Sequence, residues 1–106
     1  METLKKEKDF KRVMSEGKKI SDKYFKAIFA GNELGKTRIA IVTRKGLGKA
    51  VERNRVKRRI MEAVRANRPD ASADIVIFPD ITAKTADFVG MRQAACRILQ
   101  RIGSVK

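Results

Sequence analysis

The chain has 106 residues, 42% of them apolar, and its 26 Lys and Arg against 12 Asp and Glu give a net charge of +14. A chain of this length forms one domain with a single modest core, so we expect residues 1–106 to fold as one unit. The single cysteine excludes an internal disulfide, and neither a secretion leader nor a run of 18 apolar residues occurs, so we expect a cytoplasmic protein without membrane insertion.

Hydrophobic periodicity divides the chain into helices and strands. In chain order we expect a helix at residues 5–16, a strand at 24–30, a strand at 37–43, a basic helix that ends before Pro69, a strand at 74–78 and a helix from Thr85 to Gly103. A further short strand at residues 18–21 is compatible with the pattern. The element order is then αβββαβα, which belongs to the α+β class.

The first and last helices are predicted from the spacing of their apolar residues. Phe10, Val13 and Met14 recur at three- and four-residue steps, and Gly17 follows where a left-handed C-cap would end the helix. The last helix has the same periodicity and is expected to begin at a Thr85 N-cap.

The basic helix is the most informative segment of the chain. Residues 44–68 carry ten Lys or Arg and two Glu, a net charge of +8. On a helical wheel a buried stripe is formed by Val56, Ile60, Ala63, Val64 and Asn67. A cationic face lies beside this stripe, with Arg55 and Arg59 on the far flank. Ordinary exposed helices interleave acids at four-residue steps, and because this helix has few acids we expect a nucleic acid partner rather than simple solvation.

Catalysis by the protein's own side chains is poorly supported. The chain has no histidine, which removes the commonest general base and the commonest zinc ligand. Cys96, on the apolar side of the last helix, is best interpreted as a small core residue. Asp70, Asp74 and Asp80 lie near strand or loop ends, where they suit a hydrated magnesium ion, but turn and capping roles are favoured.

Residues 50–58, Ala-Val-Glu-Arg-Asn-Arg-Val-Lys-Arg, resemble the signature helix of the bacterial ribonuclease P protein subunit. In that family an Arg-Asn-Arg core is followed one residue later by Lys-Arg. The spacing of Asp9-Phe10, Val13, Gly17 and Tyr24-Phe25 upstream, and of the Asp74-Ile-Val-Ile run downstream, is also similar to the family. The resemblance therefore covers nearly the whole chain.

The resemblance implies an α/β sandwich like the second domain of ribosomal protein S5, with a four-stranded, mainly antiparallel sheet. A left-handed crossover through the basic helix would join the third strand to the fourth. The resemblance also implies that the protein joins a large catalytic RNA, and that the complex removes the 5′ leader of precursor tRNA by hydrolysis. The expected cofactor is Mg²⁺ held mainly by the RNA and the substrate, which agrees with the missing protein base. Neither DNA nor a membrane is an expected partner.

Family roles carry over where the residues match. The residues expected to contact RNA lie on the basic helix or just before it: Lys49, Arg53, Asn54, Arg55, Lys57, Arg58 and Arg65. The residues expected to line a cleft for the single-stranded leader are Phe10, Met14, Lys26, Ile28 and Lys45. The chain departs from the family at Met14 and Ile28, which are commonly aromatic, and at Met61 and Asp80, which are commonly basic. No catalytic residue and no metal ligand is expected in the protein.

Two other functions stay open at this point. A general structural RNA-binding protein, of ribosomal or chaperone type, would use the same basic helix without a leader cleft. A nuclease that acts without an RNA subunit is the weakest alternative. The leading interpretation is a non-catalytic protein subunit of a ribozyme endonuclease.

Overall fold

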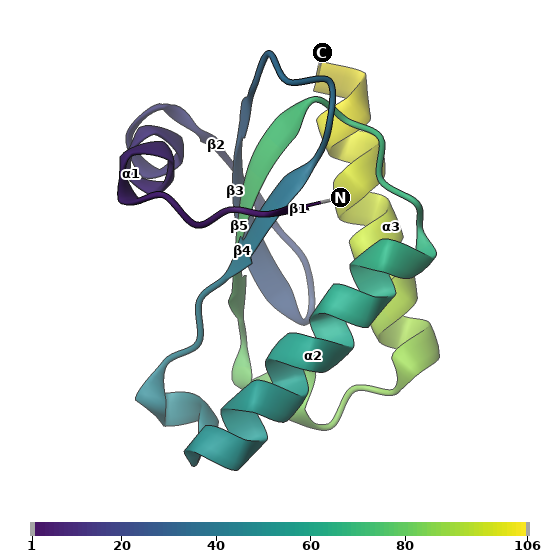
Figure 1. Ribbon diagram of the computed structural model, residues 1–106. Helices are drawn as coiled ribbons and strands as arrows, with labels where there is room; N and C mark the ends of the chain where they lie inside the picture. Colours follow the sequence, from purple (N-terminus) through teal and green to yellow (C-terminus); the bar gives the residue numbers. More distant parts are fainter. Residues whose placement is uncertain (1, 106) are drawn as a thin grey trace.

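The computed structural model describes residues 2–105 as a sheet with helices on both faces (Figure 1). Its elements, in chain order, are β1 (Glu2–Thr3), α1 (Glu7–Glu16), β2 (Lys18–Ser21), β3 (Phe25–Gly31), β4 (Arg38–Ile41), the 3-10 helix η1 (Lys45–Leu47), α2 (Ala50–Ala66), β5 (Ala73–Pro79), the 3-10 helix η2 (Ile81–Lys84) and α3 (Phe88–Val105). Helix α1 covers one face of the sheet, and α2 and α3 pack together on the other. None of the helices within residues 2–105 combines the length and the apolar character that crossing a bilayer requires.

The sheet has five strands, one more than expected. The extra strand is β1, which pairs in parallel with β4. The amide of Glu2 donates to the carbonyl of Thr37 at 3.0 Å, and the amide of Leu4 donates to the carbonyl of Ile39 at 2.8 Å. A strand of two residues shows no period, so the sequence could not indicate β1. The additional short strand at residues 18–21 is confirmed as β2.

The strand order is β1-β4-β5-β3-β2. Strand β4 pairs in parallel with β1 and β5, whereas β3 pairs antiparallel with β5 and β2. The four expected strands are therefore mainly antiparallel, as predicted, but β1 makes the whole sheet evenly mixed. In Figure 1 β4 and β5 both run downward with β4 nearer the viewer, and α2 returns on the right. The β4–α2–β5 crossover is thus left-handed, an exception to the usual right-handed connection.

The larger core lies between the sheet and helices α2 and α3. The members of the predicted stripe that expose 2% or less of their surface are Val56, Ile60, Ala63 and Val64. The fifth member, Asn67, is only half-buried, and its amide donates to the carbonyls of Ala63 and Arg92. Cys96 is half-buried, at the margin of this core rather than inside it. This packing turns the charged sides of α2 toward solvent.

A smaller core lies between the sheet and α1, built from Leu4, Val13, Ile28 and Val76. Gly17 brings the end of α1 close to β3. A Cβ at Gly17 would lie 2.4 Å from the carbonyl oxygen of Val13 and 2.7 Å from Cγ2 of Ile28. The expected left-handed C-cap at Gly17 is wrong, because its φ is −74°. Glycine is needed here for the close approach of two chain segments.

Helix α3 begins and ends later than expected. Thr85 is not its N-cap, because η2 occupies the preceding residues and Oδ1 of Asp87 accepts a hydrogen bond from the amide of Gly90 at 2.7 Å. Asp87 stands directly before the first helical residue, where a carboxylate satisfies a free amide and faces the positive end of the helix dipole. At the other end the helix continues through Gly103 to Val105.

Candidate RNA interface

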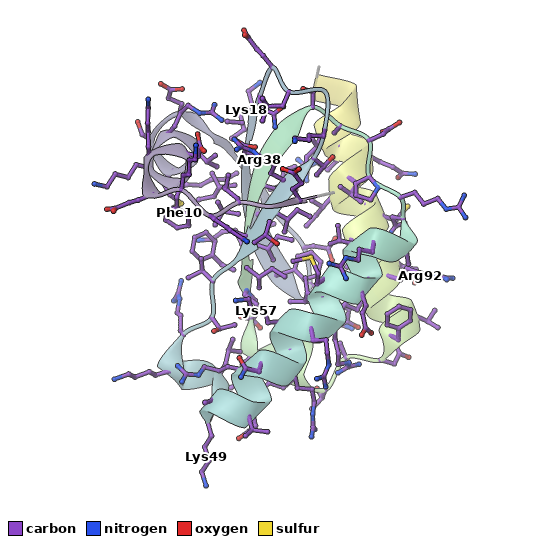
Figure 2. The ribbon with its side chains drawn as sticks, in the orientation of Figure 1. Phe10, Lys18, Arg38, Lys49, Lys57 and Arg92 are labelled. Atoms are coloured by element: carbon purple, nitrogen blue, oxygen red, sulfur yellow. The ribbon has the colours of Figure 1, made fainter. Side chains whose placement is uncertain are left out.

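The solvent-facing side of α2 carries the expected RNA-contacting residues. The helix packs its apolar stripe on the sheet, and Lys49 and Lys57 extend from it in Figure 2. All members of the expected set have exposed or half-exposed side chains: Lys49, Arg53, Asn54, Arg55, Lys57, Arg58 and Arg65. We call this set the basic face.

The cations of the basic face are not neutralised by the protein's own acids. Within residues 2–105, no ion pair joins any of them to a carboxylate. Glu52 is instead held by Nζ of Lys84 at 2.8 Å, and it accepts from the amide of Lys49 at 3.4 Å. The hydrogen bond from Lys84, and after it the bond from the Lys49 amide, lower the pKa of Glu52. The positive charge of the basic face therefore stays available to a polyanion.

The flank of α2 that faces α3 and η2 has a structural role. Nη2 of Arg59 donates to the carbonyl of Ala86, in the loop before α3. The pair between Glu52 and Lys84 joins α2 to η2 on the same flank. The charged residues of α2 thus form two groups. Those on the flank contact η2 and the loop before α3, whereas those of the basic face remain available to a polyanion.

A groove of about 210 Å³ lies between α1 and the sheet. Its lining residues come from α1, three strands and the loop after β4: Met14, Lys19, Lys26, Ile28, Arg44 and Phe78. We call this hollow the α1 groove. Three of the five expected cleft residues, Met14, Lys26 and Ile28, line it together. It combines apolar side chains, one of them aromatic, with cations, as a single-stranded nucleic acid requires.

The other two expected cleft residues lie outside this lining. Phe10 is one helical turn before Met14 and packs, half-buried, against the smaller core (Figure 2). Lys45 lies in η1, and its neighbour Arg44 lines the groove instead. The contact of Lys45 with the leader therefore stays a prediction.

Sequence reasoning missed three lining residues, Lys19, Arg44 and Phe78. Strand pairing brings two of them to the groove, because Lys19 pairs with Ile28 and Phe78 pairs with Lys26. Side chains alternate along a strand, so Phe78 shares the α1 side of β5 with Val76, a signal that the sequence does contain. The sequence contains no comparable signal that would place Lys19 at the groove, because neither strand alone determines the register in which two strands pair.

A second hollow of about 570 Å³ continues from the α1 groove. The residues that line both are Lys26, Arg44 and Phe78. Asp22 and Asp80 also line this second hollow. The hydrogen bond from Arg97 lowers the pKa of Asp22, with Nε and Nη2 each 2.9 Å from a carboxylate oxygen. Asp80 accepts from the amide of Thr82 at 3.1 Å, which lowers its pKa and gives it the capping role favoured above.

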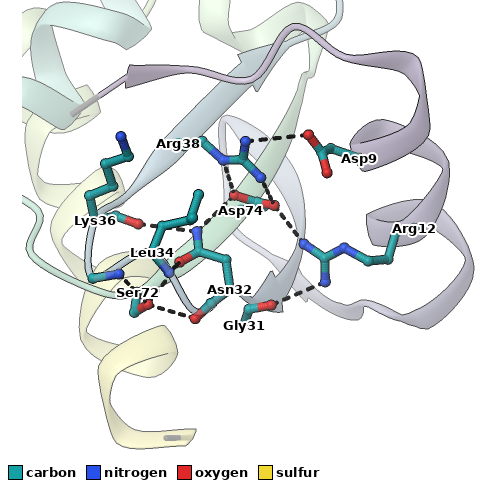
Figure 3. A network of polar contacts seen from close by, with 10 residues as sticks. Asp9, Arg12, Gly31, Asn32, Leu34, Lys36, Arg38, Ser72 and Asp74 are labelled. Atoms are coloured by element: carbon teal, nitrogen blue, oxygen red, sulfur yellow. Dashed lines mark hydrogen bonds and ion pairs between the residues drawn. The ribbon is translucent and has the colours of Figure 1, made fainter.

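Asp74 lies under α1 with no exposed surface (Figure 3). Nε and Nη2 of Arg38 each donate to it at 2.7 Å, Nη2 of Arg12 donates at 2.6 Å, and Nδ2 of Asn32 donates at 2.8 Å. Burial raises the pKa of Asp74, but the hydrogen bonds from Arg38 and Asn32 outweigh burial and hold the pKa below its usual value. Its oxygens are occupied by these donors, and within residues 2–105 no cluster of His, Cys, Asp or Glu is suited to a metal ion.

Comparison with known proteins identifies the family. A family model described as Ribonuclease P matches residues 1–103. The chain belongs to the ribonuclease P protein family. The ribonuclease P protein component of Dictyoglomus turgidum is 35% identical over 109 aligned residues, which cover 99% of this chain and 92% of that protein. The component of Thermotoga maritima is 33% identical over 107 residues, which cover 95% and 92%.

Solved ribonuclease P proteins have the same fold. The structure from Thermotoga maritima superposes with a TM-score of 0.85 at 31% identity, covering 95% of this chain and 97% of that one. The structure from Staphylococcus aureus gives a TM-score of 0.80 at 27% identity, covering 97% and 95%. The fold thus agrees with the family assignment, and a component of ribonuclease P is part of an endoribonuclease. The general structural RNA-binding alternative is not favoured.

Proposed function

We propose that the protein bridges two RNAs, binding ribonuclease P RNA with the basic face and the 5′ leader of precursor tRNA with the α1 groove. One observation carries the proposal: within residues 2–105 the six cations of the basic face form no ion pair with a carboxylate. Uncompensated Arg and Lys on one helix repel each other, and a phosphate backbone relieves that repulsion while releasing counterions. Arg also forms paired hydrogen bonds with phosphate.

The α1 groove suits a short single strand. Phe78, Met14 and Ile28 offer apolar surface for bases, and Phe10 stands beside them on α1. Lys26 and the other two lining cations face the same hollow, where phosphates of the strand would lie. Stacking of a base on an aromatic side chain is worth about 1 to 3 kcal/mol.

In this proposal the RNA performs the cleavage. Mg²⁺ held by RNA phosphates would supply a hydroxide nucleophile and would stabilise the leaving oxygen. The protein contributes charge on α2 and a place for the leader, which brings the substrate to the RNA and screens phosphate repulsion there. The single free cysteine suits a reducing compartment, so we infer that the complex works in the cytoplasm.

Binding and cleavage at low magnesium with ribonuclease P RNA test the proposal. Wild-type protein should restore leader removal, and Arg53→Ala combined with Lys57→Ala should weaken assembly. The slope of log affinity against log salt should shrink by about 0.9 for each lost duplex phosphate contact. The matched control, Lys5→Ala with Lys18→Ala, removes equal charge away from α2 and should keep most of the slope.

The same assay tests the groove. Phe10→Ala should weaken the binding of precursor tRNA to the assembled complex by about fivefold, the lower limit for one lost stack, while mature tRNA binds as before. Equal salt slopes for the two double variants would contradict RNA binding by the basic face. Equal losses for precursor and mature tRNA would contradict the leader groove, and binding without restored cleavage would favour a general RNA-binding protein.

A further inference from the structure

Asp74 has no place in the proposed RNA contacts, although it is a charged group with no exposed surface. A buried ion network is weak evidence for stability, because removing charges from water offsets most of their attraction. Such a network can instead select one geometry over near alternatives. The helix and strands that supply the hydrogen-bond donors of Asp74 show which arrangement it selects.

Two arms of the network reach α1 (Figure 3). Arg12 belongs to α1, and it donates to Asp74 at 2.6 Å and to the carbonyl of Gly31 at 3.1 Å. Asp9, three residues earlier on the same helical face, accepts from Nη1 of Arg38 at 3.3 Å. Arg38 is the residue that holds Asp74 with its other two nitrogens. Helix α1 is therefore tied to β4 and β5 through one buried carboxylate.

The same helix forms a wall of the α1 groove. Met14 lines the groove and Phe10 lies one turn before it. On the sheet below, Asp74 and Phe78 share one face of β5 and are four residues apart, a span of about 13 Å. The apolar contact of Val13 with the sheet lies between α1 and this face. The ion network thus holds α1 at one end of its contact area, and the groove lies at the other end.

The hydrogen bonds of the ion network are directional, so they can fix the rotation of α1 about its own axis. Val13 and the half-buried Phe10 set how close α1 comes to the sheet, but apolar contacts are non-directional and resist rotation of the helix weakly. A side chain that ends about 6 Å from the helix axis moves about 2 Å when the helix turns by about 20°. Rotation of α1 would therefore spoil the alignment of Phe10 and Met14 with a bound strand.

We propose that Asp74 is a positioning residue for the α1 groove. Through Arg12 directly, and through Arg38 and Asp9, it sets the rotation of α1 and so the place of Phe10 beside the bound leader. The inference rests on the proposed leader function of the groove. It assigns to the network an effect on leader binding that is separate from general stability.

Arg12→Gln tests the inference, with Lys11→Gln as its matched control. Both remove one positive charge from α1, but Lys11 is 75% exposed and pairs with Glu7 on the same helix. The measurement is the affinity of the assembled complex for precursor tRNA and for mature tRNA. Arg12→Gln should weaken precursor binding about fivefold and change mature tRNA binding less than about twofold, since only the stack is disturbed. Lys11→Gln should leave the ratio of precursor affinity to mature tRNA affinity unchanged. Arg12→Lys keeps a donor to Asp74, so it should keep most of the wild-type preference for precursor tRNA.

A double-variant cycle separates positioning from stability. If Arg12 acts through Phe10, then Arg12→Gln should change the precursor-to-mature ratio by less than about twofold when Phe10→Ala is already present. Asp9→Asn, which loosens the other arm, offers the same test should Arg12→Gln not fold. Folded variants that keep the wild-type ratio, or effects that add fully to those of Phe10→Ala, would overturn the inference. A wild-type ratio in Phe10→Ala itself would instead overturn the leader function.

Discussion

The side chain of Asp74 gives the protein a dependence of stability on pH. Burial raises its pKa, but the hydrogen bonds from Arg38 and Asn32 outweigh burial, so the folded-state pKa lies below the usual value. A carboxyl group of this kind adds stability that is fully present above its unfolded-state pKa of about 3.9. That stability is lost as the pH falls through the folded-state pKa. We therefore expect the Asp74 contribution to be constant near neutral pH and to decline in acid.

Asp74→Asn isolates this contribution. The variant leaves the two arginines facing a neutral amide, and we expect it to lower the free energy of unfolding by about 3 kcal/mol at neutral pH. Urea unfolding followed by circular dichroism measures the loss. The difference between wild type and variant should narrow below about pH 4, where the unfolded wild-type chain begins to bind the proton. A difference that stays constant down to about pH 2 would contradict the assignment.

At the scale of elements, the start of α3 provides a direct comparison of two candidate caps. Oδ1 of Asp87 accepts from the amide of Gly90, whereas Thr85 stands before the helix begins. We expect Asp87→Ala to lower the free energy of unfolding by about 1 kcal/mol, the usual loss for a removed N-cap. Thr85→Ala should change it by less than about 0.5 kcal/mol, as exposed substitutions do. Chemical denaturation of both variants measures the difference. Equal losses of unfolding free energy would contradict the assignment of Asp87, rather than Thr85, as the cap of α3.

Periodicity predicted each α-helix and each strand longer than two residues, but it placed their ends less well. The stripe of Val56 and Ile60 repeats over several turns, so many residues agree on one helix. The end of a helix depends on single hydrogen bonds, such as the one accepted by Asp87. A second possible acceptor nearby, here Thr85, is enough to make the predicted end wrong. Strand β1 forms by pairing with the edge of β4, and that edge exists only once the sheet has formed.

At the scale of the whole molecule, the two binding surfaces differ in how far the sequence could predict them. The basic face lies on one helix and the residue before it, so residue spacing alone places most of its members on the side of the helix away from the core. The α1 groove combines side chains from α1, three strands and a loop, and the register between those strands brought Lys19 and Phe78 into it. The left-handed crossover also depends on the packing of the whole chain, and only the family resemblance implied it.

The charge of the whole molecule sets two opposite responses to salt. The net charge is +14, and the molecule measures 35 × 27 × 20 Å along its principal axes. At about 0.01 M salt the Debye length of about 30 Å spans the molecule, whereas at about 0.1 M it is about 10 Å. We therefore expect the melting temperature of the free protein to rise over this range, because salt screens the repulsion among its cations.

The affinity for ribonuclease P RNA should fall over the same range of salt, because counterion release then favours the complex less. Thermal melts followed by circular dichroism and titrations of labelled RNA measure the two responses on one preparation. A melting temperature that falls with salt would mean that exposed ion pairs, such as Lys36 with Glu2 at 2.9 Å, outweigh the repulsion. In that case the protein's own acids would be compensating its cations, and the excess charge would no longer explain why it binds RNA.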